Sequence, residues 1–335
     1  MPLFMAPLSL KDDIMDLLKL IKEKCDSFSD PEIVQGLGSV TSHIEIAERH
    51  LDKGKTGEDY LFTDVVYRTN QAFEGSLKEA YRVLTGNKPE KLTPYKIEQY
   101  LEQNSILKER VLSLFKNYRE EWRNKSTHDY KLYFSEQEAF LAIVNICAFF
   151  NILLDQMIEK KAYIQEKIEL SKSGTFTPKQ IQDKNLLEQI IQLLVKFSND
   201  VPSKVQGTSM PRYFERELIG MLDAYMDAAD EQIEVITEYA IPAGERKLYA
   251  DFLVRKGESS LLIEIKNPTK SIATLLNHGK EQLFTYMNAS GINDGILYIP
   301  PLRNDSTKMI TREVELKIDD VKKRVVEIFP EKYFA

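Results

Sequence analysis

The chain has 335 residues, of which 43% are hydrophobic and 29% are charged, so it has the composition of a folded globular protein and not of a disordered one. Its net charge of −7 excludes attraction to nucleic acid by overall charge, and any such binding needs a local basic patch or a bound metal. The two cysteines, Cys25 and Cys147, exclude a zinc ribbon and a disulfide framework and fit a reducing compartment. The first ten residues lack the basic segment of a signal peptide, so we expect a cytoplasmic location.

The first half of the chain predicts helices throughout. Apolar residues recur at helical spacing, an Asp30-Pro31 pair starts one helix, and Gly86 closes another. The predicted helices cover 10–27, 30–51, 58–84, a short segment from Thr93, and 105–122. A capping box, Ser135 to Glu138, begins a further helix that reaches about Leu170. We therefore expect an all-α bundle over residues 1–170. Its longest apolar run, 139–154, is shorter than a membrane span, so we expect a buried helix and no membrane contact.

The second half mixes helices and strands. A polar segment, 171–185, predicts a linker, and residues 186–335 predict a second domain with a mixed sheet. Its predicted helices cover 181–197, a segment from Glu215, a segment around Gln282, and 319–329. Its predicted strands cover 233–239, 249–254, 261–265, 296–299 and 309–318. The fold class is therefore a two-domain α+β protein, helical first and a mixed-sheet α/β sandwich second.

One predicted hairpin carries the most informative side chains. Residues 249–254 and 261–265 flank a polar turn, which is a hairpin signature. Glu264 and Lys266 are two residues apart and point to the same face of a strand, and Asp251 lies alongside on the partner strand. Two converging carboxylates suit Mg²⁺, and a neighbouring lysine can position or activate an attacking water.

This pattern resembles the PD-(D/E)XK superfamily of nucleases, which have the restriction-endonuclease-like fold. The motif is Asp251-x12-Glu264-Ile265-Lys266, although Ala250 stands where many members have proline. The run from Glu215 to Leu222 resembles the helix that supplies a further metal-binding glutamate in some members, with Glu217 as the alternative. Gln282 and Tyr286 resemble the Q-x-x-x-Y helix that follows. The resemblance implies that Asp251, Glu264 and Glu215 bind Mg²⁺ or Mn²⁺, that Lys266 activates water, that Gln282 orients the lysine or the water, and that Tyr286 supports them.

A second motif lies in the helical half. Arg123 and His128 form an R-x4-H motif at a helix junction, with Asn124 directly after the arginine. Here the chain resembles the HEPN superfamily of ribonucleases and nucleotide-binding helical domains, and Glu74 matches the acidic residue of an earlier helix. Histidine can move a proton near neutral pH, and arginine can stabilise a phosphorane-like transition state without a metal. The resemblance implies a homodimer, because two such motifs usually form one cleft.

Together the two resemblances imply a nuclease that cleaves DNA, RNA or both, with a metal-dependent C-terminal site and a metal-independent ribonuclease site in the helical domain. By analogy, such a pairing implies prokaryotic defence against phage or plasmids. Two alternatives stay open. The helical domain can be a non-catalytic dimerisation or sensing module, or the whole chain can be a nucleic-acid-binding subunit that does not cut.

Overall fold

The computed structural model describes residues 17–124, 133–173, 185–200, 214–268, 271–302, 307–318 and 321–334. The chain forms two compact units, Met1–Ile158 and Glu159–Ala335. The expected domain border at residue 170 lies twelve residues further along, inside the long helix α7 (Glu136–Ser173). The last part of α7 therefore belongs to the C-terminal unit. The first three residues of the expected linker, 171–173, are the end of α7, and residues 174–184 lie outside the described residues.

The N-terminal unit is helical, and its helices begin and end at residues of the expected kinds. Asp30 accepts hydrogen bonds from the backbone N–H groups of Glu32 and Ile33, and Gly86 ends its helix in the left-handed conformation. Ser135 and Glu138 form the predicted capping box at the start of α7. Before α7, the described elements are α1 (Leu17–Cys25), α2 (Pro31–Lys55), α3 (Leu61–Thr85), α4 (Pro94–Gln103), α5 (Glu109–Tyr118) and the π-helical turn η1 (Arg119–Arg123).

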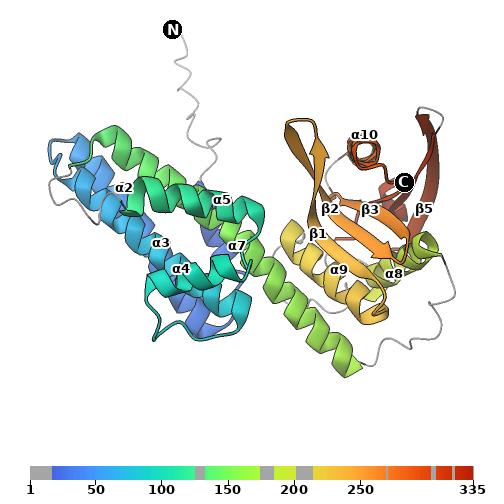
Figure 1. Ribbon diagram of the computed structural model, residues 1–335, viewed down its shortest axis with the longest axis horizontal. Coiled ribbons are helices and arrows are strands. Elements are labelled where there is room, and N and C mark those ends of the chain that lie inside the picture. The colour runs from blue at the N-terminus through green and yellow to red at the C-terminus, as the bar shows by residue number, and fades with distance from the viewer. Residues whose placement is uncertain are drawn as a thin grey trace, which may run out of the picture. The chain divides into compact units, whose positions relative to one another are not determined.

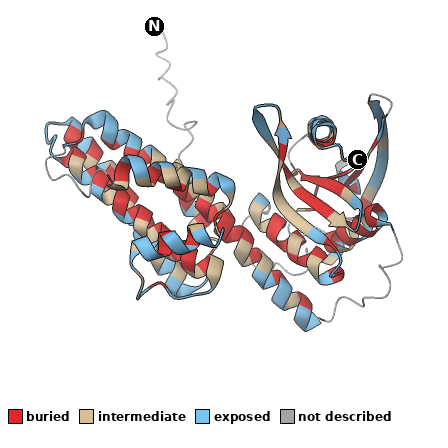
Figure 2. Ribbon diagram, viewed as in Figure 1, coloured by how far each residue is buried: buried red, intermediate tan, exposed pale blue. Residues whose placement is uncertain are grey.

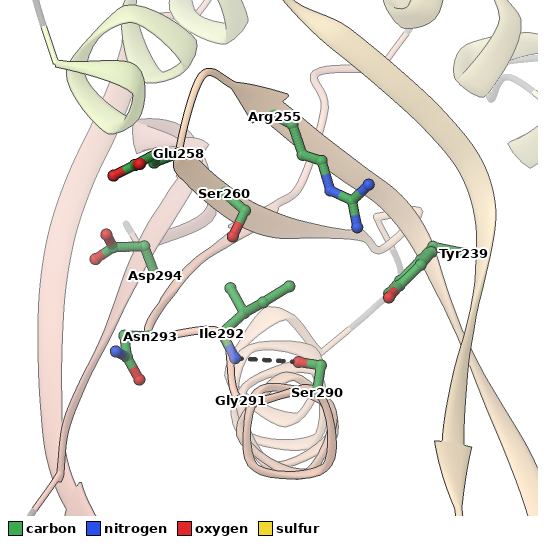
Figure 3. A pocket seen from close by; sticks show the side chains of 9 residues that line it. All are labelled: Tyr239, Arg255, Glu258, Ser260, Ser290, Gly291, Ile292, Asn293 and Asp294. Atoms are coloured by element: carbon green, nitrogen blue, oxygen red, sulfur yellow. Dashed lines mark hydrogen bonds between the residues drawn. The ribbon is translucent and has the colours of Figure 1, made fainter.

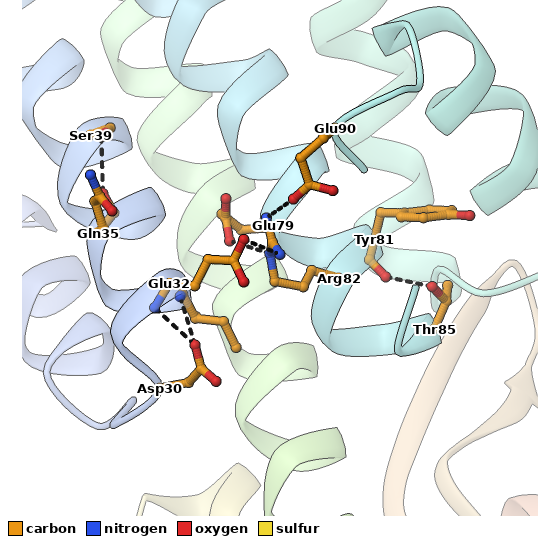
Figure 4. A network of polar contacts seen from close by, with 10 residues as sticks. Asp30, Glu32, Gln35, Ser39, Glu79, Tyr81, Arg82, Thr85 and Glu90 are labelled. Atoms are coloured by element: carbon orange, nitrogen blue, oxygen red, sulfur yellow. Dashed lines mark hydrogen bonds and ion pairs between the residues drawn. The ribbon is translucent and has the colours of Figure 1, made fainter. Parts of the chain in front are cut away.

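The core of this unit lies between α2, α3 and α7, and Figure 2 shows their buried faces. Polar contacts join α2 to α3 at the edge of that core (Figure 4). The Arg82 guanidinium lies 2.8 Å from Glu32 on α2 and 2.8 Å from Glu90, and 3.4 Å from the buried Glu79. A Cβ on Gly36 would lie 2.2 Å from a carboxylate oxygen of Glu79, so the glycine permits this close approach.

Among the described residues, one helix, α7, is long and apolar enough to cross a membrane, and most of its apolar window is buried inside the protein. Its buried residues there include Phe149, Phe150, Leu153 and Leu154. The expectation of a buried helix over 139–154 is confirmed.

The C-terminal unit is a six-stranded mixed sheet covered on both faces. The strand order is β1-β2-β3-β4-β6-β5, with parallel pairing of β3 with β4 and of β4 with β6. The helices are α8 (Leu186–Asp200) and α9 (Glu215–Ala229), which cover one face, and α10 (Ile272–Ser290), which covers the other (Figure 1). The strands are β1 (Glu234–Ala243), β2 (Arg246–Lys256), β3 (Ser259–Ile265), β4 (Asp294–Tyr298), β5 (Met309–Ile318) and β6 (Val321–Pro330), followed by the 3₁₀ turn Glu331–Phe334.

The prediction of a terminal helix over 319–329 is wrong, because residues 321–330 form β6. This strand pairs antiparallel with β5 and parallel with β4. Its side chains at Val325, Val326, Ile328 and Phe329 are all buried, since both faces of the sheet are covered here. A strand buried on both faces loses the polar–apolar alternation that distinguishes a strand from a helix in sequence.

The helix predicted over 105–122 is also different in the structure. Ser105 has a φ of 51°, which is incompatible with a helix, and α5 begins only at Glu109. At its other end α5 widens into η1, and the buried Trp122 lies in this turn as part of the core. The π-helical turn changes the direction of Arg123 relative to a continuous α-helix.

Candidate active site

Asp251 and Glu264 lie side by side at one end of the β2–β3 hairpin. The Oδ2 atom of Asp251 accepts a hydrogen bond of 2.7 Å from the backbone N–H of Ile265, the residue after Glu264. Glu264 is only 3% exposed, and its buried Oε2 atom has no hydrogen-bond partner within the described part of the chain. The hairpin that the sequence predicts therefore brings the two carboxyls together.

The carboxyls of Asp251 and Glu264 lie in a poorly solvated environment, which raises the pKa of each. Burial, together with the charge of Glu264, raises the pKa of Asp251 to about 8. Burial also raises the pKa of Glu264, although the Lys266 ammonium opposes that change. Without a further cation, the site therefore disfavours two negative charges at neutral pH.

Lys266 is held at the centre of a short hydrogen-bond chain. Its Nζ donates to Glu264 Oε1 at 2.7 Å and to Gln282 Oε1 at 2.8 Å. The Nε2 of Gln282 donates in turn to the hydroxyl of Tyr286 at 2.6 Å, one turn further along α10. Burial opposes the charge of Lys266, but the neighbouring carboxylates outweigh it and raise its pKa. Lys266 therefore stays protonated and acts as a fixed hydrogen-bond donor.

Glu215 begins α9 and completes the acidic surroundings. Its charge contributes to the raised pKa of both Asp251 and Glu264, which places it near them. This electrostatic proximity favours Glu215 over Glu217 as the additional acid. The next residue, Arg216, binds Glu238 at 3.0 Å and lies 3.7 Å from Glu159, and these contacts hold the start of α9 against β1 and α7.

The donor set fits a hard divalent cation. Within the described residues, no three His, Cys, Asp or Glu side chains are already grouped as a metal site. Mg²⁺ is usually held by only one or two carboxylates, with waters and substrate phosphate as the other ligands. The unpartnered, buried Oε2 of Glu264 and the adjacent carboxyl of Asp251 fit that pattern.

Part of the second predicted site is also brought together. The Nε of Arg123 lies 3.6 Å from Glu74, and its Nη1 lies 3.8 Å from Glu98. Asn124 directly follows η1, and its backbone N–H donates to the carbonyl of Arg119. His128, the second residue of the R-x4-H motif, lies outside the described residues.

Two contacts were missed in the sequence. Glu98 on α4 is 2% exposed, and burial raises its pKa against the lowering effect of Arg123. Its place between the buried Ile97 and Leu101 is the only local signal that it faces inward. No local sequence pattern marks Glu159 as a partner of Arg216. Glu159 lies 57 residues earlier, in a segment that the sequence assigns to the N-terminal bundle.

No protein-family model matches the chain, and no curated protein is significantly similar to it. The chemistry of the two sites is therefore interpreted from their geometry.

Proposed function

We propose that the C-terminal unit is a metal-dependent nuclease that hydrolyses phosphodiester bonds of DNA, RNA or both. The observation that supports this most directly is the cluster of Asp251, Glu264 and Lys266. Two carboxyls with raised pKa values adjoin a charged lysine, and one buried carboxylate oxygen has no partner. Structural ion pairs in a sheet normally balance their charges and hydrogen bonds, so this imbalance favours a functional site.

In this proposal Asp251 and Glu264 bind Mg²⁺ or Mn²⁺, with Glu215 contributing from α9. The ion, when bound, supplies positive charge that polarises the scissile phosphate. Lys266 is fixed between Glu264 and Gln282, and it holds a water in position for attack on the phosphorus. Gln282, which Tyr286 restrains, keeps the lysine in that orientation. The fold that this assignment requires is the restriction-endonuclease-like fold, and the mixed sheet between α9 and α10 is compatible with it.

The test is cleavage of labelled single- and double-stranded DNA and RNA by the full chain, with Mg²⁺, with Mn²⁺ and with EDTA. We expect cleavage that requires the metal and that Asp251→Ala and Glu264→Ala abolish. Unchanged metal-dependent cleavage in both variants contradicts the proposal.

A second activity, in the helical unit, is favoured by the position of Arg123. We propose that Arg123 and His128, with Asn124 and Glu74 in support, form a metal-independent ribonuclease site of the HEPN type in a homodimer. The π-helical turn and the two acids hold the guanidinium in one place. RNA cleavage that survives EDTA and is lost in Arg123→Ala and His128→Ala supports this site.

The same experiment separates the alternatives. Cleavage that is entirely metal-dependent, with no change in the Arg123 and His128 variants, supports a non-catalytic dimerisation or sensing role for the helical unit. Binding of nucleic acid without any cleavage supports a binding subunit. A role in prokaryotic defence rests on resemblance, and its test is whether expression of the chain in bacteria reduces phage or plasmid yield.

A further inference from the structure

A polar cavity of about 440 Å³ lies at the other end of the hairpin from the candidate active site (Figure 3). It is bounded by the turn end of β2 and β3, by β1, and by the C-terminal end of α10. This volume is within the range of sites that bind one small molecule or one nucleotide. The proposed function leaves this cavity unassigned.

One side of the cavity carries donors. Arg255 and Ser260 are cross-strand partners on β2 and β3, and Tyr239 comes from β1. The hydroxyls of Tyr239 and Ser260 make no hydrogen bond to the described part of the chain, and the ion pair of Arg255 is a long one, 3.9 Å to the exposed Glu234. These groups are therefore available to a ligand.

The opposite side carries acceptors. Figure 3 shows Glu258, Asn293 and Asp294 across the cavity from Arg255 and Tyr239. Asp294 is bound by Arg324 at 2.9 Å, but a carboxylate has more than one acceptor position to offer. The last turn of α10 ends nearby, at Ser290, and adds the negative end of a helix dipole. The acidic groups and the helix end on this side would therefore repel a ligand that is only an anion. Such a ligand would be attracted only by the side that carries Arg255.

The cavity lies a short distance along the hairpin from the candidate active site. Tyr239 pairs with Ala250, the neighbour of Asp251. Ser260 lies four residues before Glu264 on β3, which is a separation of about 13 Å at a rise of about 3.3 Å per residue. A strand with its scissile phosphate at Asp251 and Glu264 therefore reaches the cavity with a nucleotide only a few positions away.

We propose that this cavity binds one nucleotide of the substrate strand, which it selects for a base with an exocyclic amine. Arg255 binds the phosphate, Tyr239 stacks on the base, and Glu258 with Asp294 accepts hydrogen bonds from the amine of cytosine, adenine or guanine. Thymine and uracil have no such amine, and their ring N3–H lies between two carbonyl oxygens that the two carboxylates would repel. This inference rests on the proposed nuclease function, because it identifies the cavity as part of the path of that substrate.

The test is binding of short fluorescent oligocytidylate and oligothymidylate by the full chain in an Asp251→Asn background with Mg²⁺. We expect oligocytidylate to bind at least about 5-fold more tightly, since a base-edge contact commonly discriminates by that much. Glu258→Gln, an exposed turn substitution, should remove this preference. Arg255→Ala should weaken both ligands by a similar factor and reduce the salt dependence by about one phosphate contact. Arg246→Ala, on the same strand but outside the cavity, is the matched control and should change neither.

The outcomes separate this inference from the nuclease proposal. Equal binding of both oligonucleotides, with no effect of Arg255→Ala beyond that of Arg246→Ala, overturns the nucleotide site. In that case, the chain without the Asp251→Asn substitution is tested for cleavage. If it cleaves, and if Arg255→Ala does not change its KM, only the nuclease proposal is supported. If cytosine is preferred in a manner that depends on Glu258, but no cleavage occurs with any metal, the nucleotide site stands and the nuclease proposal fails.

Discussion

The backbone N–H of Ile265 donates a 2.7 Å hydrogen bond to the carboxylate of Asp251. Ile265 lies between Glu264 and Lys266, so one bond ties the acid on β2 to the strand that carries the other two polar side chains. The bond stabilises the charged form of Asp251, and burial with the charge of Glu264 outweighs it. The result is an acid that is positioned for a cation but costly to ionise without one.

The first prediction is that the contribution of Asp251 to the stability of the metal-free protein falls as the pH rises from about 4 to about 8. The pKa of Asp251 is raised from 3.8 to about 8, so the folded state holds a proton in this range that the unfolded state releases. In EDTA, Asp251→Asn should therefore gain stability over the wild type, and the gain should grow by up to about 1.4 kcal/mol per pH unit. Denaturation across this pH range measures it, and a constant difference contradicts the raised pKa.

The second prediction concerns Lys266→Met. Loss of the positioned ammonium should lower kcat for metal-dependent cleavage by about 100-fold or more, the scale of a positioned proton-transfer or water-orienting group. Stabilisation of the protein by Mg²⁺ should survive, since the carboxylates remain. Lys322→Met, on the exposed part of β6, is the control. A parallel loss of metal binding and cleavage would instead assign Lys266 a purely structural role.

Third, Arg123→Ala should destabilise the helical unit whether or not the residue takes part in catalysis. The substitution removes the larger of two cationic influences on the buried Glu98 and leaves only that of Arg119, at a cost of about 1–3 kcal/mol. Glu98→Gln in the same chain should recover part of this loss, because a neutral amide needs no counter-charge. Thermal unfolding of the single and double variants measures the coupling, and additive effects would show that the two residues do not interact.

Fourth, the proposed homodimer can be tested on the exposed apolar residues at the start of α7. Phe140, Leu141 and Val144 are 50%, 40% and 41% exposed and share one side of the helix. Phe140→Glu with Val144→Glu should convert a dimer to a monomer in light scattering after size-exclusion chromatography. Ile168→Glu, an equally exposed apolar position on the same helix, should leave the mass unchanged. A dimer that persists in the double variant places the interface elsewhere.

Fifth, Gly220→Ala should destabilise the C-terminal unit by about 1–3 kcal/mol, the usual cost of overpacking. Its new Cβ would lie 2.1 Å from the carbonyl oxygen of Glu159, where α9 packs on the last part of α7. Gly38→Ala is the matched control, because open space surrounds it on α2 and alanine favours a helix by about 1 kcal/mol. Equal effects of the two substitutions on the urea midpoint would contradict the close packing.

The sequence predicted the strands and helices that carry strong local signals. Asp30, Gly86 and the capping box at Ser135 mark helix ends through their own hydrogen bonds or backbone conformation, so they can be read without a fold. The contact of Asp251 with Glu264 was predictable for a similar reason, since a short hairpin fixes its own register.

What the sequence could not predict depends on distant partners. The sequence predicted a helix in place of strand β6, because the helices on both faces of the sheet bury its side chains and its apolar residues do not alternate with polar ones. The inward position of Glu98 depends on Arg123, 25 residues later, and the cavity at Arg255 is formed by four strands and the end of a helix. Such arrangements come from tertiary packing, which leaves only weak traces in local periodicity.

The assignment of Glu159 to the C-terminal unit has a practical consequence for dividing the gene. A fragment that begins at residue 186, after the apparent linker, would lack the carboxylate that accepts from Thr237 and lies beside Arg216, and the backbone against which Gly220 packs. In such a fragment α9, the helix that carries Glu215, would lack its support. Misplacement of Glu215 would by itself be sufficient to remove the proposed cleavage activity. The smallest autonomous C-terminal unit therefore begins within α7, upstream of Glu159, and crystallisation or screening of the separate domain should start there.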